Sequence, residues 1–263
     1  MLVKPGKKID LKEIDPADTG RFNSADETEA LLQKQLEEIS KLQNLLYAES
    51  RRAVLIILQG MDTSGKDGTI RHVMSGLSPL GVQVTAFKAP TDEELGHDFL
   101  WRVHRAVPRQ GYIGIFNRSH YEDVLVVRVH DLVPKKVWKQ RYEQINEFEK
   151  TLVRNNVVIL KFFLHISKGE QRERLRQRLD DPARYWKFSL KDVEERKLWS
   201  SYRKAYEAVL ERCSTKWAPW HIIPADHKWY RNLLVAESIV KAMRALDMKY
   251  PSPTIDLSKI KVD

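Results

Sequence analysis

The chain has 263 residues, of which 42% are hydrophobic and 31% are charged. This composition supplies enough apolar material for a full core and excludes wholesale disorder, and the length indicates one large domain or one domain with a small appendage. The 45 basic and 36 acidic residues leave a net charge of +9. Such an excess favours an anionic partner, namely nucleic acid, an anionic membrane surface or a phosphorylated substrate, although a merely basic soluble surface is the plain alternative.

Three features lead us to expect a cytoplasmic protein. The longest apolar run, from Val54 to Leu58, is too short to cross a bilayer. The first residues, MLVKPGKKIDLK, contain no apolar segment of the kind that directs secretion. The single cysteine, Cys213, excludes an internal disulfide and a cysteine-based metal cluster, so we expect it to be a packing residue.

The first 50 residues are predicted to form an arm and a helix that pack on the remainder of the chain, residues 51–263. Residues 1–25 are polar and contain two prolines and two glycines, which is typical of irregular structure. Ser24 or Asp26 is expected to cap a helix that runs to about Tyr47, because leucine and isoleucine recur there at helical spacing.

Beyond this helix, apolar segments alternate with helical segments. The predicted strands are 53–59, 82–87, 112–116, 157–167 and 220–224. The predicted helices are 69–75, 92–106, 134–154, 169–179, 190–212 and 230–247. This alternation predicts an α/β fold with a parallel sheet that is covered by helices on both faces. Such folds bind ligands at the carboxyl ends of their strands.

The loop after the first predicted strand has the composition of a phosphate-binding loop. It reads GMDTSGKDGT, and Gly60, Gly65 and Lys66 have the spacing G-x-x-x-x-G-K. Glycines allow backbone N–H groups to surround anionic oxygens, the following helix presents its positive end, and the lysine supplies a charge. The other predicted phosphate-binding residues of this loop are Thr63, Ser64, Asp67 and Gly68. A plain glycine turn is the alternative.

The loop departs from the usual pattern at one position. The serine or threonine that normally follows the lysine and binds Mg²⁺ is replaced by Asp67, and Thr69 lies two residues further on. Asp62, inside the loop, is an oxygen ligand that suits Mg²⁺ and is our candidate for the metal. The alternative is that Asp62 only makes local hydrogen bonds in a turn.

A second polar segment, NRSHYED, follows the third predicted strand, which we expect to lie beside the first. Arg118, Glu122 and Asp123 belong to this segment. In phosphate-loop enzymes a carboxylate here completes the Mg²⁺ shell, and an arginine neutralises charge on the transferring group. A helix start with acidic residues in its first turn is an alternative that is compatible with this interpretation. His120 is interpreted as structural or as a support for neighbouring site residues, because no histidine or cysteine pattern around it has metal-ligand spacing.

Two further groups of cations are candidates for anion binding. Arg174 and Arg178 share a helical face, and with Lys187 they belong to a segment, about 168–198, that we predict to be a lid over the phosphates. The alternative is a solvated amphipathic helix. Arg102 and Lys88, between the loop and the third strand, are candidates for an acceptor phosphate and a second anion, against ordinary surface charge.

These motifs together resemble the second polyphosphate kinase family. The resemblance rests on GMDTSGKDGT, FNRSHYEDVLVVRV, LKFFLHIS, RLDDPARYWKF and APWHIIPADHKWYRN, and it covers the chain from about Lys4 to its end. It implies a P-loop kinase fold similar to thymidylate kinase, with a helical lid. It also implies inorganic polyphosphate as donor, Mg²⁺ or Mn²⁺ as cofactor, and commonly a tetramer. The third motif resembles the subgroup that phosphorylates both AMP and ADP, because other members more often have DRSWYNR.

The resemblance also assigns roles to individual residues. Asp62 and Asp123 match the metal-binding carboxylates, Lys66 the loop lysine, and Arg118 the arginine beside the transferring group. By the same resemblance, Arg178 and Lys187 are expected to bind polyphosphate. Apart from the resemblance, Arg102, Asn117 and Glu122 are our candidates for binding the nucleotide.

The resulting hypothesis is a polyphosphate-dependent phosphotransferase that converts AMP to ADP and ADP to ATP, with no nucleic-acid or membrane partner. Its rivals are an ATP-dependent nucleotide kinase of the same fold and a basic nucleic-acid-binding protein with a phosphate loop.

Overall fold

The computed structural model of the chain describes residues 1–256, 260 and 262. Its centre is a sheet of five parallel strands in the order β2-β3-β1-β4-β5. The strands are β1 (Ala53–Gln59), β2 (Val82–Ala86), β3 (Ile113–Asn117), β4 (Val157–His165) and β5 (Trp220–Pro224). This arrangement confirms the predicted α/β fold and the predicted position of the third strand beside the first.

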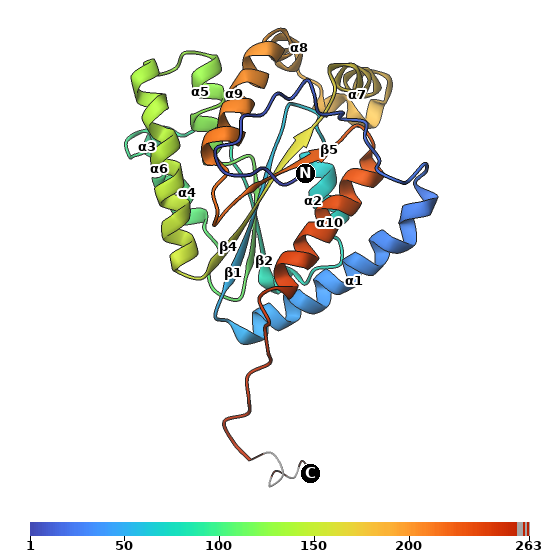
Figure 1. Cartoon of the computed structure of the whole chain (residues 1–263), viewed down its shortest axis with the longest axis vertical. Helices are drawn as coiled ribbons and strands as arrows, with labels where there is room; N and C mark the ends of the chain where they lie inside the picture. Colours follow the sequence, from blue (N-terminus) through green and yellow to red (C-terminus); the bar gives the residue numbers. More distant parts are fainter. Residues whose placement is uncertain (257–259, 261, 263) are drawn as a thin grey trace.

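Helices follow the strands and cover both faces of the sheet (Figure 1). They are α1 (Asp26–Glu49), α2 (Lys66–Val73), α3 (Asp92–Leu95), α4 (Trp101–Ala106), α5 (Val126–Val129), α6 (Lys135–Arg154), α7 (Lys168–Asp180), α8 (Leu190–Lys197), α9 (Trp199–Cys213) and α10 (Lys228–Arg244). Short 3-10 turns are η1 (Pro79–Gly81), η2 (His120–Asp123) and η3 (Pro182–Lys187).

Two helix predictions were wrong because a local turn interrupts each predicted segment. The segment 92–106 divides into α3 and α4: Gly96 ends α3, and the Asp98 carboxylate accepts a hydrogen bond from the N–H of Leu100 just before α4. The segment 190–212 divides at Leu198, whose N–H bonds to the carbonyl of Glu195 in a tighter turn. Apolar residues at roughly helical spacing continue on both sides of each break, so the periodic pattern does not reveal the breaks.

The two faces of the sheet bury separate hydrophobic cores. Leu55 and Ile57 of β1 point to a core shared with α6 and α9. Val54 and Ile56 point to the opposite core, shared with α1 and α10. Successive strand residues face opposite sides, so a central strand with both faces covered is apolar throughout. Every residue of β1 is buried accordingly.

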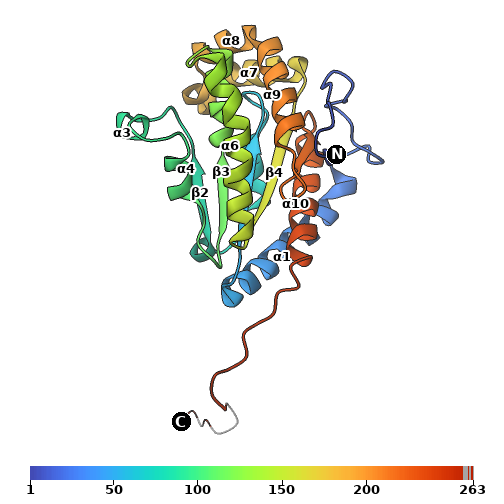
Figure 2. The ribbon, with the colours of Figure 1, turned by 60° about the vertical axis from the view of Figure 1, so that its left-hand side comes forward.

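The N-terminal arm lies along the edge strand β5. The N–H of Val3 donates to the carbonyl of Trp220 over 2.9 Å, and Leu2 forms an isolated antiparallel bridge with His221. The helix that follows, α1, packs along α10, as the turned view also shows (Figure 2). Within the described part of the chain, none of the helices is long and apolar enough to cross a membrane.

The carboxyl ends of the five strands meet at the end of the molecule where α7 and α8 lie (Figure 1). The strand β1 has β3 on one side and β4 on the other, and the order of strands reverses there. In open parallel sheets, this point of reversal is where ligands bind. A ligand site is therefore expected at the loops after β1 and β3.

Candidate phosphate-transfer site

The loop after β1 leads into α2 with its N–H groups available for an anion. Gly65 is the residue just before α2, it has a φ of 102°, and no side chain caps the helix there. The first N–H groups of a helix have no partner within the helix, and its N-terminus carries partial positive charge. A Cβ on Gly65 would clash with the guanidinium of Arg231, so both the backbone angle and the close approach require glycine here.

Lys66 lies over this loop and is buried. Its Nζ donates to the carbonyl of Gly60 over 2.8 Å and to that of Met61 over 3.2 Å. Burial, followed by the charge of Arg118, lowers the pKa of Lys66 to about 8. A bound polyanion would favour the charged ammonium form, so the lysine is suited to an anionic ligand.

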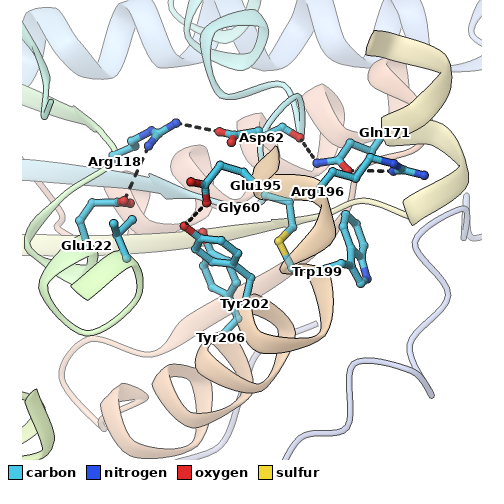
Figure 3. A pocket seen from close by; sticks show the side chains of 12 residues that line it. Gly60, Asp62, Arg118, Glu122, Gln171, Glu195, Arg196, Trp199, Tyr202 and Tyr206 are labelled. Atoms are coloured by element: carbon cyan, nitrogen blue, oxygen red, sulfur yellow. Dashed lines mark hydrogen bonds and ion pairs between the residues drawn. The ribbon is translucent and has the colours of Figure 1, made fainter. Parts of the chain in front are cut away.

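Asp62, Arg118 and Glu122 form a chain of ion pairs beside the loop. Arg118 Nη2 lies 2.7 Å from Asp62 Oδ1, and Arg118 Nη1 lies 3.7 Å from Glu122 Oε2 (Figure 3). Burial raises the pKa of Glu122, although the charges of Arg118 and Lys66 oppose that shift. The structure thus brings four predicted site residues into one electrostatic cluster.

Backbone strain marks the same two segments. Thr63, in the loop, and Arg118, directly after β3, both have a φ of 63°. Such left-handed angles are unfavourable for residues other than glycine, above all for a β-branched residue such as threonine. Strain of this kind persists only where the surrounding structure holds it, and it concentrates at functional sites.

Two further predicted residues connect the loops after β1 and β3. Asn117 Nδ2, at the end of β3, donates to Asp67 Oδ1 over 2.7 Å. Asp67, which replaces the usual serine or threonine, therefore aligns the start of α2 with the end of β3. Ser64 is buried within the loop, and the hydroxyl of Thr69 donates to the carbonyl of Gly65 over 3.1 Å.

Asp123 belongs to a different group of charges from Asp62. Arg141 Nη1 lies 3.0 Å from Asp123 Oδ1, and Arg102 Nη2 lies 4.0 Å from Asp123 Oδ2. Burial raises the pKa of Asp123 to about 6, against the opposing charges of these two arginines. Arg102 also donates to the carbonyl of the exposed residue Lys88 over 2.9 Å. Asp123, Arg102 and Lys88 thus lie together near the end of β2.

The metal site was expected at Asp62 and Asp123. Across residues 1–256, 260 and 262, no group of three or more His, Cys, Asp or Glu side chains is arranged to hold a metal ion. Mg²⁺ commonly takes one or two carboxylates and completes its shell with substrate phosphates and water. Asp62 fits this donor set, and Glu122, joined to it through Arg118, is a second carboxylate in the same cluster.

The predicted lid comprises α7, η3 and α8. Arg178 donates to the carbonyl of Lys187 over 3.1 Å and to Asp192 Oδ2 over 3.0 Å. The Nζ of Lys187 lies 4.9 Å from the centre of the Trp186 ring. These contacts hold the segment together, and the phosphate-binding role of Arg178 and Lys187 stays a prediction.

A pocket lies between the loop, the η2 segment and the helices α7 to α9 (Figure 3). Gln171, Glu195, Arg196, Trp199, Tyr202 and Tyr206 line it together with the predicted site residues Gly60, Asp62, Arg118 and Glu122. Arg196 Nη1 donates to Gln171 Oε1 over 2.9 Å, and the hydroxyl of Tyr202 donates to Glu195 Oε2 over 2.7 Å. Sequence reasoning did not assign these lid and α9 residues, because polar residues on amphipathic helices resemble solvated surface.

Behind η2 lies a buried ionic network that the sequence analysis also missed. Lys161 Nζ is 2.6 Å from Glu149 Oε2, and both side chains are fully buried. The hydroxyl of Tyr121 donates to Glu149 Oε1 over 2.7 Å, and His120 Nε2 lies 3.3 Å from the same oxygen. His120 is therefore structural, as predicted. The available signal was a lysine inside the otherwise apolar strand VVILKFFLH.

Cys213, expected to be a packing residue, is fully buried at the end of α9. Its carbonyl accepts a hydrogen bond from Lys161 Nζ over 2.7 Å. Burial raises the pKa of its thiol to about 12, so the thiolate is disfavoured at neutral pH. The packing role is confirmed.

The fold and this site define a class of enzyme. A parallel sheet carries a glycine–lysine loop before α2, and carboxylates and an arginine follow the neighbouring strand. The helices α7 and α8 lie at the same end of the sheet (Figure 1). This is the architecture of a P-loop kinase.

The family within this class follows from comparison with known proteins. The family model described as Polyphosphate kinase 2 (PPK2) matches residues 22–251, and the chain belongs to this family. The AMP/ADP-polyphosphate phosphotransferase of Meiothermus ruber is 52% identical over 99% of this chain and 98% of its own length. The ADP-polyphosphate phosphotransferase of Rhodopseudomonas palustris is 46% identical over 96% of this chain and 91% of its own length.

A solved structure gives the same result. The crystal structure of polyphosphate kinase 2 from Arthrobacter aurescens TC1 superimposes with a TM-score of 0.93 at 41% sequence identity. The match covers 98% of this chain and 95% of that chain.

Proposed function

We propose that the chain is a polyphosphate-dependent nucleotide phosphotransferase. It transfers the terminal phosphoryl group of inorganic polyphosphate to AMP and to ADP, which gives ADP and ATP. The observation that carries the proposal is the loop after β1, where a helix N-terminus without a side-chain cap, Lys66 and the Asp62–Arg118 pair meet. The Meiothermus ruber relative, whose name includes both acceptors, supports the dual specificity.

The donor phosphates are assigned to the loop. The N–H groups at the start of α2 and the ammonium of Lys66 supply positive charge without a large reorganisation during the reaction. The net charge of +9 is useful here, because polyphosphate carries about one negative charge per phosphate. Its binding should weaken as salt rises.

The transfer itself requires alignment and charge stabilisation. A terminal phosphate oxygen of the nucleotide attacks the terminal phosphorus of polyphosphate in line and forms a new O–P bond. The bridging P–O bond breaks, and polyphosphate leaves one phosphate shorter with the electron pair on its new terminal oxygen. Arg118, beside Asp62, stabilises charge on the transferring group. The nucleophile is already an ionised phosphate oxygen, so no strong general base is required.

A bound Mg²⁺, or Mn²⁺ in its place, would neutralise charge on the phosphate oxygens at this site. Asp62 is its proposed protein ligand. The resemblance implies Asp123 as the second ligand, although Asp123 pairs with Arg141 and Arg102 outside the cluster of Asp62 and Glu122. Arg102, Asn117 and Glu122 are proposed to contact the nucleotide, and Arg178 and Lys187 to contact polyphosphate from the lid. We further propose a cytoplasmic homotetramer that has no nucleic-acid partner.

The test uses the purified protein with Mg²⁺ and long-chain polyphosphate, incubated in parallel with AMP and with ADP. Formation of ATP from ADP supports polyphosphate as donor, and formation of ADP and then ATP from AMP alone supports the dual acceptor. Product from ADP but not from AMP would contradict the dual specificity. A control with chelator in place of Mg²⁺ is expected to give no product, and full activity there would contradict the metal requirement.

A further inference from the structure

The motif near the C-terminus, APWHIIPADHKWYRN, contributes none of the site residues assigned so far. The structure places its arginine, Arg231, directly behind the phosphate loop. Arg231 lies in the first turn of α10 and is only 2% exposed. Its Nη1 donates to the carbonyl of Ser64 over 3.3 Å, and its guanidinium packs against Gly65 so closely that a Cβ there would clash.

A second buried arginine, Arg174 of α7, holds the neighbouring residue of the loop. Its Nη1 donates to the carbonyl of Thr63 over 2.9 Å. Its Nη2 donates over 2.6 Å to the carbonyl of Ala225 and over 2.9 Å to that of Asp226, both in the segment that leads to α10. Arg174 therefore joins the loop, the start of the lid and the same C-terminal motif.

Holding these carbonyls determines where the loop amides point. The C=O and the following N–H of a trans peptide point in opposite directions, and the described chain contains no cis peptide. The Ser64 carbonyl is turned toward Arg231, so the N–H of Gly65 faces away from Arg231. The contact of Arg174 with Thr63 supports the left-handed backbone of that residue, which is unfavourable by itself.

The charge of Arg231 is also available to an anion on the other side of the loop. Its hydrogen bonds go to the side-chain carbonyl of Asn232 and the backbone carbonyl of Ser64, both of which are uncharged. Burial and then the charge of Arg174 lower the pKa of Arg231 to about 9, which reflects how poorly this charge is compensated. Electrostatic attraction is stronger across the poorly hydrated interior than through water, so a polyanion at the loop would benefit from this cation.

We propose that Arg231 is a positioning residue for the polyphosphate donor: it holds the Ser64 carbonyl and places positive charge behind Gly65 without contacting the substrate. The inference deepens the proposed function and rests on it, because it assumes that the loop holds polyphosphate. It distinguishes Arg231 from a purely structural arginine, whose loss would affect donor and acceptor alike.

The experiment compares Arg231→Met and Arg231→Lys with Arg244→Met, a control on the same helix. Arg244 pairs with Glu38 of α1 over 2.8 Å and lies outside the donor site. We expect Arg231→Met to raise KM for polyphosphate about tenfold or more and to leave KM for AMP unchanged. Arg231→Lys keeps the charge but lacks the guanidinium fork, so its KM for polyphosphate should lie between those of the wild type and Arg231→Met. Arg244→Met should match the wild type.

A folded Arg231→Met variant with wild-type KM for polyphosphate would overturn the inference, and so would equal changes in both KM values. Thermal unfolding checks the fold. If Arg231→Met does not fold, Arg231→Lys decides the matter: a KM for polyphosphate raised about threefold or more supports the inference, and an unchanged value overturns it.

Titration of tripolyphosphate into the wild type and the variants by calorimetry measures donor affinity without turnover. We expect weaker binding in both Arg231 variants than in the wild type and Arg244→Met. A wild type that binds tripolyphosphate but does not phosphorylate AMP or ADP would contradict the proposed function and leave this inference standing. Equal tripolyphosphate affinity in all folded variants would contradict the inference alone.

Discussion

The segments that follow β1 and β3 form one site but are held in place in different ways. The loop after β1 is held through its backbone, because Arg174 and Arg231 bind the carbonyls of Thr63 and Ser64. The segment after β3 is held through its side chains, because Tyr121 and its neighbour His120 bind the buried carboxylate of Glu149.

This difference matches what each segment presents. A loop anchored by its carbonyls can direct the amides at the start of α2 toward phosphate oxygens. A segment anchored by His120 and Tyr121 instead presents the ion pair of Arg118 and Glu122 beside Asp62. The comparison also predicts different effects of substitutions in the two segments. Changes in the first segment should reduce activity in a folded protein, and changes behind the second should mainly reduce stability.

The largest expected effect on activity is that of Asp62→Asn. The substitution keeps the size of the side chain but removes the negative charge that pairs with Arg118 and that is proposed to bind Mg²⁺. We expect turnover to be abolished while circular dichroism and thermal unfolding stay close to the wild type. Near-normal kcat would disprove the metal assignment.

Lys66→Ala should have the next largest effect. If Lys66 stabilises charge in the transition state, its removal should lower kcat by about 10²–10³. The protein should still fold, because within the described residues the lysine donates only to loop carbonyls. A loss of less than tenfold in kcat, measured at saturating polyphosphate, would show that Lys66 only assists binding.

The buried network behind η2 should respond in stability. Lys161→Met alone leaves the carboxylate of Glu149 buried without its cation, which typically costs about 3–5 kcal/mol of the free energy of unfolding. Urea unfolding measures this cost. The double variant Lys161→Met with Glu149→Leu removes both charges and should be more stable than Lys161→Met. Additive losses in the double variant would contradict the account of a charge pair.

The smallest expected effect is on pH dependence. The pKa of Lys66 is lowered to about 8 in the free protein, so the lysine loses its charge as the pH rises through that value. We expect kcat/KM for polyphosphate to fall about tenfold per pH unit well above pH 8, because this parameter reports the free enzyme. Bound polyanion raises the pKa of the lysine, so kcat should fall only at higher pH. Identical limbs in both profiles, or no fall up to pH 9.5, would contradict this assignment.

Parts of the fold that depend on local pattern were predictable from the sequence. The bounds of β1 and β5 match the prediction because each is a short, mainly apolar segment that ends at a polar or turn residue. The phosphate loop was also predictable from local pattern, because its glycines and Lys66 are close together in the sequence. The division of the segment 92–106 was not, because it depends on one glycine and one aspartate turn.

The support of the site depends on contacts between distant residues. Arg231 and Ser64 are 167 positions apart, and no local pattern relates them. The roles of adjacent residues were hard to predict for a different reason. Glu122 and Asp123 are adjacent, yet the η2 turn directs one toward Arg118 and the other toward Arg141. The sequence alone does not show which carboxylate shares the cluster of Asp62.

The identity of the donor is the central claim, and a donor exchange tests it most directly. Initial rates of ADP formation from AMP are measured with long-chain polyphosphate and, separately, with ATP, at equal Mg²⁺ and equal concentrations of terminal phosphoryl groups. The account predicts rapid transfer from polyphosphate and little from ATP, because the loop serves an extended polyanion without a nucleoside. Efficient transfer from ATP with none from polyphosphate would contradict it and would identify a conventional nucleotide kinase.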